Sequence, residues 1–399
     1  MTEPAPLADA APLDRVRARI LGDPVTQMRL AQLYDSTLFV SAVMEIAVTL
    51  GVTLTEDIVH AAMRTDPLGL DRFVVKPITG RDAPGADWLP IAVASDGNEL
   101  AVDWAHFAGA RLTAPFYEDS LRRARALPLN RLVRQRTPLA GLARAGEDMR
   151  PPDGFIFHLS RCGSTLVSQM LAADPHVVMV SEAPPIDSIV QLVESHPDVP
   201  IEERAHVLRA MVAALGRNRA AHHYVVKLDS WHALALPLFR LAFPDTPWIF
   251  LYRDPVEILV SQMRQRGVQT VPGTIRFDPY RIDGAEEMSG EEYCARTLDR
   301  VCTAVLDNIA SGGGLIINYT DLPGAVDDLI LPHFGITPDA KARAAMAAAT
   351  RFDAKTPTEA FTGDSEAKQR EAGAAVRSAA ALADQSYRRL ESLRTATVE

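Results

Sequence analysis

The chain from residue 154 onward alternates between short apolar runs and stretches with helical spacing of apolar residues. The runs are almost continuously apolar, which is typical of strands that are covered on both faces. Strands that alternate with helices in this way predict an α/β fold in which a doubly wound parallel sheet is flanked by helices. In chain order, the runs are GFIFHL, HVVMV, YVVKL, WIFLYR and GLIINY.

The region before these runs predicts a helical part followed by an irregular part. Residues 1–12 are rich in Ala and Pro, which favours a disordered tail. Residues 13–65 carry apolar residues at helical spacing with breaks at Gly22 and Gly51, and this pattern predicts a small module of three short helices. Residues 66–149 mix short apolar runs with Gly, Pro and Asp, so we interpret them as an irregular α+β connector.

A group of turn-forming residues, Pro151-Pro152-Asp153-Gly154, separates the connector from the apolar runs. With 399 residues the chain is long enough for two domains. We therefore predict that the main domain covers residues 150–399.

Charge and apolar content argue against two classes of partner. The formal net charge is −10, whereas binding to nucleic acids or anionic membranes depends on a clustered basic surface. We therefore expect no nucleic-acid partner. The longest apolar region, Leu38–Leu54, is interrupted by Glu45 and is too short to span a bilayer, so we expect no membrane insertion. The sequence does not specify an oligomeric state.

The cysteines and the N-terminus indicate a cytoplasmic protein. The N-terminus is polar and lacks the basic-then-apolar layout of a signal peptide. The cysteines show neither CxxC spacing nor a nearby His cluster, so we expect neither a disulfide framework nor a zinc site. They are Cys162, Cys294 and Cys302.

The junction between the first apolar run and the following helix predicts an anion site. The first N–H groups of a helix lack internal partners and carry the positive end of the helix dipole, so an anion is their natural ligand. In the loop Ser160-Arg161-Cys162-Gly163-Ser164-Thr165, Arg161 adds a fixed positive charge and Gly163 lets the backbone come close. Ser164 and Thr165 add hydroxyl groups. The loop resembles a nucleotide-binding P-loop without its signature lysine.

Polar residues end the other predicted strands as well, and ligands of doubly wound sheets bind at these ends. Asp254 also reads as the N-cap of the next helix, with Pro255 in the first turn and Glu257 as the reciprocal capping acid, which leaves Arg253 available for a ligand. The strand ends are Ser160-Arg161, Ser181-Glu182, Lys227-Leu228-Asp229, Arg253-Asp254 and Asn318-Tyr319.

Two segments, SRCGSTL and FLYRDPVEILVSQMRQR, resemble the nucleotide-binding elements of sulfotransferases that use 3′-phosphoadenosine 5′-phosphosulfate (PAPS). In that family the first element cradles the 5′-phosphosulfate. The second supplies an arginine and, eight residues later, a serine for the 3′-phosphate, and here these are Arg253 and Ser261. Tyr319 lies in a segment similar to the family's late Y-x-D-L motif. The resemblance covers roughly residues 150–375 and implies that PAPS is the co-substrate.

We assign donor binding to the loop, the second element and one C-terminal lysine. Among the basic residues of 351–370, the candidates that close over the 3′-phosphate are Lys355, Lys368 and Arg370, and we select Lys355. The predicted donor-binding residues are Ser160, Arg161, Cys162, Gly163, Ser164, Thr165, Arg253, Ser261, Tyr319 and Lys355.

The arginine in the loop is similar to that of the protein-tyrosine sulfotransferases. In that subtype a glutamate at the end of the next strand is the base and a lysine at the following strand is catalytic, which implies these roles for Glu182 and Lys227. The helical module resembles a nitrogen-fixation-type leader-peptide module, and a helical cap on the main domain is the alternative. Both resemblances favour a peptide acceptor, while a small alcohol, sugar or lipid stays open.

Sulfuryl transfer moves a trigonal anionic group in line between two oxygens, so positioning and charge stabilisation dominate its catalysis. We predict that Arg161 and Lys227 stabilise the transferring group and that Glu182 takes the proton of a hydroxyl or amine acceptor. His232 is the alternative base. The scheme requires no metal.

Two other classes of function remain as alternatives. A P-loop kinase or nucleotidase is disfavoured because GxxxxGK[ST] is absent from the chain and no predicted strand ends in an obvious magnesium aspartate. The other alternative is a non-catalytic nucleotide-binding or leader-peptide-binding protein.

Overall fold

The computed structural model describes residues 11–65, 75–96, 99–145, 150–217, 221–275, 278–352, 354 and 363–398. The chain forms two compact units. Unit 1 consists of Met1–Arg111 and Glu118–Met149, and unit 2 consists of Leu112–Tyr117 and Arg150–Glu399. None of the helices in the described part combines the length and the apolar character that a bilayer crossing needs.

Unit 1 begins with helices, and the sequence prediction of three was wrong. Residues 13–65 contain four: α1 (Pro12–Leu21), α2 (Pro24–Ala31), α3 (Ser36–Thr49) and α4 (Glu56–Ala62). The missed break lies before α3, where the Asp35 carboxylate accepts hydrogen bonds from the backbone N–H groups of Thr37 and Leu38 at 2.9 and 3.0 Å. This N-cap interrupts an apolar spacing that otherwise continues across it.

A small sheet completes unit 1. Its strand order is β1-β4-β3-β2. The strands are β1 (Ile78–Thr79), β2 (Trp88–Asp96), β3 (Glu99–His106) and β4 (Gln135–Pro138), and the helices are α5 (Tyr117–Ala126), α6 (Pro128–Leu132) and α7 (Leu139–Ala145). The indole N–H of Trp88 donates to Gln27 of α2 at 2.9 Å, and the buried Arg17 of α1 donates to the carbonyl of Leu132 at 2.9 Å. Buried hydrogen bonds therefore connect α2 to the sheet and α1 to α6.

Unit 2 contains a five-stranded parallel sheet, which confirms the predicted α/β fold. The strands are β5 (Gly154–His158), β6 (Val177–Ser181), β7 (His223–Lys227), β8 (Trp248–Tyr252) and β9 (Gly314–Asn318), in the order β6-β7-β5-β8-β9. The chain winds from β5 to one side of the sheet and then crosses to the other. The carboxyl end of β5 is therefore the topological switch point, where doubly wound sheets bind ligands.

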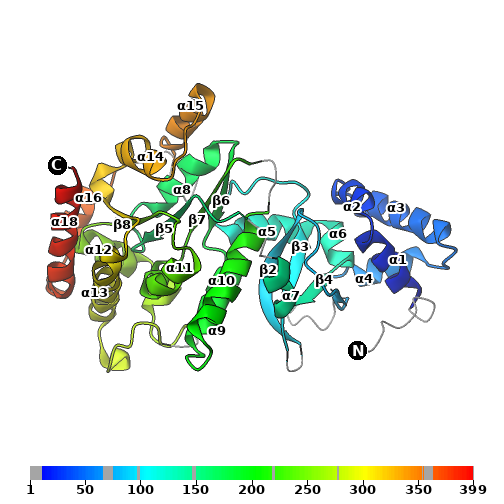
Figure 1. Ribbon diagram of the computed structural model, residues 1–399, viewed down its shortest axis with the longest axis horizontal. Coiled ribbons are helices and arrows are strands. Elements are labelled where there is room, and N and C mark those ends of the chain that lie inside the picture. Colours follow the sequence, from blue (N-terminus) through cyan, green and yellow to red (C-terminus); the bar gives the residue numbers. More distant parts are fainter. Residues whose placement is uncertain are drawn as a thin grey trace. The chain divides into compact units, whose positions relative to one another are not determined.

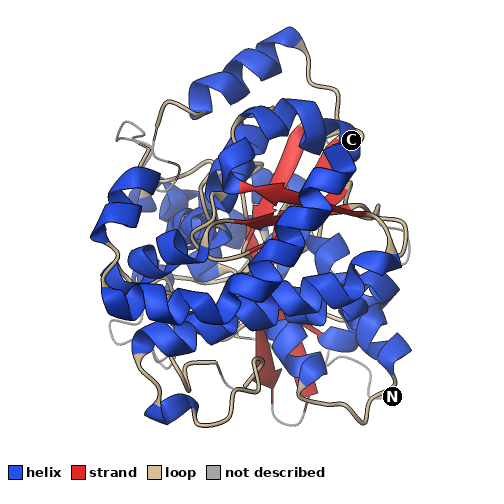
Figure 2. Ribbon diagram, turned by 90° about the vertical axis from the view of Figure 1, so that its left-hand side faces the viewer, coloured by secondary structure: helices blue, strands red, loops and turns tan. Residues whose placement is uncertain are grey.

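Helices lie on both sides of this sheet, and Figure 1 shows α8 and α15 above the strands and α11 and α13 below them. Figure 2 views the protein from the side on which Figure 1 places α18, with helices in front of the strands. The helices are α8 (Ser164–Ala173), α9 (Pro184–Glu194), α10 (Ile201–Leu215), α11 (Leu236–Ala242), α12 (Pro255–Arg264), α13 (Gly290–Asn308), α14 (Leu331–His333), α15 (Ala340–Ala349), α16 (Ser365–Glu371), α17 (Ala374–Ala380) and α18 (Asp384–Val398). Short 3₁₀ turns follow two strands, η2 (Ser230–Ala235) after β7 and η6 (Tyr319–Asp321) after β9.

Aromatic side chains fix the centre of the sheet beneath the switch point. Phe157 of β5 is buried and packs edge-on against Phe239 of α11 and Trp248 of β8, with ring centroids 5.4 and 5.9 Å apart. Every residue of β5 is buried. The strand that delivers the loop at Ser160 is therefore held rigidly on both faces.

Candidate functional site

A cavity of about 360 Å³ lies in unit 2 at the carboxyl ends of the strands. Most of the predicted site residues line it. These are Ser160, Arg161, Cys162, Gly163, Ser164, Thr165, Glu182, Arg253, Ser261 and Tyr319. Lys227 is fully buried behind this lining and contacts Glu182. Lys355 lies outside the described residues.

The loop between β5 and α8 has the geometry of an anion cradle. Gly163 is the N-cap of α8 and has a left-handed backbone with a φ of 88°. A Cβ atom there would lie 2.8 Å from the ring of Tyr319, so both the backbone and the packing require glycine. Arg161 also has a positive φ, 63°, and its guanidinium donates to the carbonyl of Gln265 at 2.7 Å. The first N–H groups of α8 are left for a ligand.

The buried Lys227 and the half-buried Glu182 form an ion pair at the ends of neighbouring strands. The Lys227 ammonium lies 2.8 Å from a Glu182 carboxylate oxygen and 3.4 Å from the Thr165 hydroxyl. The Phe116 ring covers the ammonium at 4.9 Å. Burial by itself would raise the pKa of Glu182, but Lys227 and the neighbouring His158 outweigh burial and lower it. Glu182 is therefore held as a carboxylate.

His158 adds a second positive charge beside Glu182. Its Nε2 atom lies 2.8 Å from the carbonyl oxygen of Leu228 and 3.6 Å from a Glu182 oxygen, and its Nδ1 atom lies 3.0 Å from the carbonyl oxygen of Leu159. Burial lowers the pKa of His158, but Cys162 and Glu182 raise it more strongly, to about 9. An imidazolium at neutral pH can donate from both nitrogens, as this geometry requires.

His158 is not among the site residues predicted from the sequence. A signal was present, because this histidine is the last residue of a buried strand, directly before the anion loop.

Arg253 forms the other cationic end of the cavity and is not available in the way that the sequence predicted. Its Nε atom lies 2.6 Å from a Glu257 oxygen, and its Nη2 atom lies 2.8 Å from an Asp364 oxygen and 3.0 Å from the Ser365 hydroxyl. Its guanidinium stacks 3.9 Å above the Tyr319 ring. The attraction between the guanidinium and the carboxylates of Glu257 and Asp364 outweighs the free-energy cost of burying the guanidinium.

The capping prediction for α12 was half right. Asp254 caps the helix, because its carboxylate accepts the backbone N–H of Glu257 at 3.2 Å. Glu257 is not the reciprocal capping acid, since its carboxylate pairs with Arg253 instead. A strong charge partner one turn away outcompetes the backbone N–H for this carboxylate.

Of the two candidate lysines near the C-terminus, Lys368 is the one that lies within the described residues. It lies at the same end of the cavity as Arg253. Its side chain is buried, lines the cavity and lies 2.7 Å from Asp364. Arg370 is exposed and does not line the cavity. The Asp364 carboxylate thus bridges the two cations Arg253 and Lys368.

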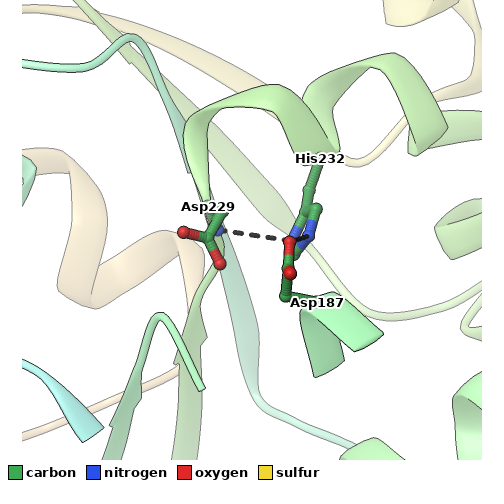
Figure 3. Close-up of side chains that lie close together, drawn as sticks. All are labelled: Asp187, Asp229 and His232. Atoms are coloured by element: carbon green, nitrogen blue, oxygen red, sulfur yellow. Dashed lines mark hydrogen bonds and ion pairs between the residues drawn. The ribbon is translucent and has the colours of Figure 1, made fainter. Parts of the chain in front are cut away.

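His232 has a structural role (Figure 3). Its Nδ1 atom accepts the backbone N–H of Asp229 at 3.3 Å, and its Nε2 atom faces an Asp187 oxygen at 3.1 Å. The side chain is fully buried and does not line the cavity. Asp187, Asp229 and His232 bring potential metal-ligand atoms within 4.8 Å of one another. However, both His232 nitrogens are engaged in these hydrogen bonds, so an ion would have to displace one of them.

One segment of the chain matches a known protein family. Residues 152–322 match the model of the sulfotransferase family, which confirms the resemblance to sulfotransferases for this segment. No curated protein matches the chain. The protein-tyrosine subtype and the leader-peptide resemblance stay predictions.

Several solved sulfotransferase structures are similar to part of the chain. STF9 from Mycobacterium avium is 13% identical, with a TM-score of 0.34, and the match covers 57% of this chain and 76% of that one. STF1 from Mycobacterium tuberculosis H37Rv is 18% identical, with a TM-score of 0.33 and coverages of 58% and 80%. The sulfotransferase domain of the Synechococcus PCC 7002 olefin synthase is 18% identical, with a TM-score of 0.34 and coverages of 61% and 90%.

Proposed function

We propose that this protein transfers a sulfuryl group from PAPS to a hydroxyl or amine acceptor. The observation that carries the proposal is one cavity with basic groups at both ends. One end consists of the α8 N-terminus with Arg161 and the nearby Lys227, and the other consists of Arg253 and Lys368. PAPS carries anionic groups on both the 5′ and the 3′ position of one nucleoside, and basic groups at both ends suit this ligand if its 3′-phosphate replaces Asp364 as the partner of Arg253 and Lys368. The match of residues 152–322 to the sulfotransferase family supports the same reaction.

In this proposal the loop residues hold the 5′-phosphosulfate through backbone N–H groups and the hydroxyls of Ser164 and Thr165. Arg253, Ser261 and Lys368 hold the 3′-phosphate. Bound PAPS supplies the activated sulfuryl group. The left-handed backbones of Arg161 and Glu182, with φ values of 63° and 50°, support a functional role for both residues, because such backbones are costly outside glycine and cluster at active sites.

Arg161 and Lys227 stabilise the negative charge that develops on the leaving phosphate oxygen and on the transferring group. Glu182 pairs with both Lys227 and His158, and its contact with Lys227 fixes the position of the ammonium group. The sequence assigns proton abstraction to Glu182, but the ion pair with Lys227 lowers the pKa of this carboxylate and makes it a poor proton acceptor. The acceptor class, including the peptide favoured by the sequence, is a proposal.

Calorimetric titration of the whole protein tests the donor assignment. We expect 3′,5′-adenosine bisphosphate to bind tightly with or without magnesium, because the cationic side chains and the α8 N-terminus supply the counter-charge. ATP should bind weakly, since its charge is concentrated at one end. Tight binding of magnesium-ATP together with weak binding of the bisphosphate would instead favour a kinase or nucleotidase.

Asp364→Asn is expected to tighten binding of the bisphosphate by roughly fivefold, because the carboxylate competes with the 3′-phosphate for Arg253 and Lys368. Calorimetry measures this change. Asp327→Asn is the matched control, since it removes an aspartate that pairs with Arg343 on the surface away from the cavity. Weaker binding in Asp364→Asn would show that Asp364 holds the two cations in place for the ligand.

A further inference from the structure

We propose that Asp229 is the carboxylate that takes the proton from the acceptor. This inference rests on the proposed sulfuryl transfer. It assigns the role of the base to Asp229 instead of Glu182. Asp229 lies two residues after Lys227 in the sequence, at the start of η2, and it lines the same cavity as Glu182. It is half-buried. A carboxyl group in this position faces the space in which donor and acceptor meet in the proposed reaction.

The other candidate bases near this end of the cavity are already engaged. Glu182 is bound to Lys227 at 2.8 Å, which lowers its basicity. Asp187 accepts hydrogen bonds from Trp231 at 2.9 Å and Gln191 at 2.6 Å, besides its contact with His232, and its pKa is lowered by these partners against the effect of burial. A carboxylate that donors hold in this way is a poor proton acceptor.

His232 and Asp229 form a reciprocal capping box at the start of η2, in which the Asp229 carboxylate accepts the backbone N–H of His232. The Nδ1 atom of His232 in turn accepts the backbone N–H of Asp229 (Figure 3). The Nε2 atom of His232 faces Asp187. The imidazole therefore orients the chain at Asp229 and does not itself face the cavity.

The surroundings of Asp229 keep it basic at neutral pH. Burial raises its pKa, His232 lowers it, and Glu182 and Asp187 raise it again, with the result that the pKa lies at about 7. His158 also acts on this carboxyl group, and Tyr280, whose pKa is itself raised by burial and neighbouring groups, lies close enough to interact with it. Lys227 lies two residues before it in the chain. A general base is most effective when its pKa is close to the working pH.

The acceptor oxygen or nitrogen forms a bond to sulfur while the bond between sulfur and the bridging phosphate oxygen breaks. The electron pair of that bond goes to the phosphate oxygen, which leaves as part of 3′,5′-adenosine bisphosphate. The proton of the acceptor passes to the Asp229 carboxylate, which becomes a neutral carboxylic acid.

The test uses release of labelled sulfate from [³⁵S]PAPS, with water as the acceptor, between pH 5 and pH 9. For the wild type we expect a rate that rises with pH and levels off above about pH 7, because the base acts only when deprotonated. Asp229→Asn should lose roughly 100-fold or more in turnover and should show no such rise, while bisphosphate binding stays within about twofold. Asp198→Asn, an exposed aspartate outside the cavity, is the matched control.

Glu182→Gln separates the two carboxylates. It removes a negative neighbour of Asp229, so the rise in rate should persist and move to lower pH. If Glu182→Gln abolishes the rise while Asp229→Asn keeps it, Glu182 is the base and the inference is wrong.

Asp229→Glu provides a second test in case Asp229→Asn fails to fold, because Asp229→Glu retains a carboxylate. It should keep the rise in rate with pH, and a flat profile in a folded Asp229→Glu protein would contradict the inference. A wild type that neither binds the bisphosphate nor releases sulfate would instead contradict the proposed function itself.

Discussion

Lys227→Met is expected to lower sulfuryl transfer by roughly 100- to 1,000-fold and to destabilise the protein by about 3–5 kcal/mol. The turnover loss follows from removing a fixed positive charge beside the proposed site of transfer. The stability loss follows because the variant leaves the Glu182 carboxylate, whose side chain is 24% exposed, without its ammonium partner. Transfer from [³⁵S]PAPS and urea unfolding measure the two effects.

The double variant Lys227→Met/Glu182→Gln separates these effects. Two neutral side chains of similar size remove the uncompensated charge, so most of the lost stability should return. Turnover should not return, because the positive charge is still missing. A double variant that regains turnover would show that Lys227 acts only by neutralising Glu182. The exposed pair of Arg343 and Asp327 is the control, and breaking it should cost less than about 1 kcal/mol.

The same ion pair predicts a dependence of stability on pH. The folded protein lowers the pKa of Glu182 below its ordinary value. The pair therefore stabilises the fold fully above the ordinary pKa of a glutamate, about 4.3, and loses this contribution as the pH falls toward the lowered folded pKa. The difference in unfolding free energy between the wild type and Lys227→Met should be largest near neutral pH and shrink in acid. A difference that grows in acid would contradict the pairing.

The sequence predicted those parts of the fold that local patterns determine. Buried parallel strands are continuous apolar runs, and their polar ends mark the binding edge, so Arg161, Glu182 and Arg253 could be proposed from sequence before the structure placed them around one cavity. Local patterns fail where two signals compete. The break before α3 was missed because Asp35 caps a helix inside a continuing apolar pattern.

The contacts of Arg253 with α16 could not be predicted, because they join distant segments. Asp364 lies 111 residues from Arg253 in the sequence, and no local pattern reports that a carboxylate of α16's N-cap reaches this arginine. The raised pKa of Asp229 could not be predicted from the sequence for a similar reason. Its pKa is raised first by burial and then by Glu182 and Asp187, which belong to other segments of the chain.

Arg253→Ala is expected to weaken binding of 3′,5′-adenosine bisphosphate by roughly 100-fold, as the loss of charge-assisted hydrogen bonds to a phosphate implies. Binding of adenosine 5′-phosphosulfate, which lacks the 3′-phosphate, should weaken much less. The ratio of the two affinities within one variant cancels any general loosening caused by leaving the buried Glu257 without its partner. Calorimetry with both ligands gives this ratio.

The matched control for Arg253→Ala is Arg264→Ala. It removes an arginine from the same helix, α12, that pairs with Glu371 on the exposed side, and it should leave both affinities unchanged. Equal losses for the two ligands in Arg253→Ala would contradict the assignment of this arginine to the 3′-phosphate. Selective loss of the bisphosphate would fix the orientation of the nucleotide, because the 5′-phosphosulfate must then lie at the other cationic end, beside the α8 N-terminus and Lys227.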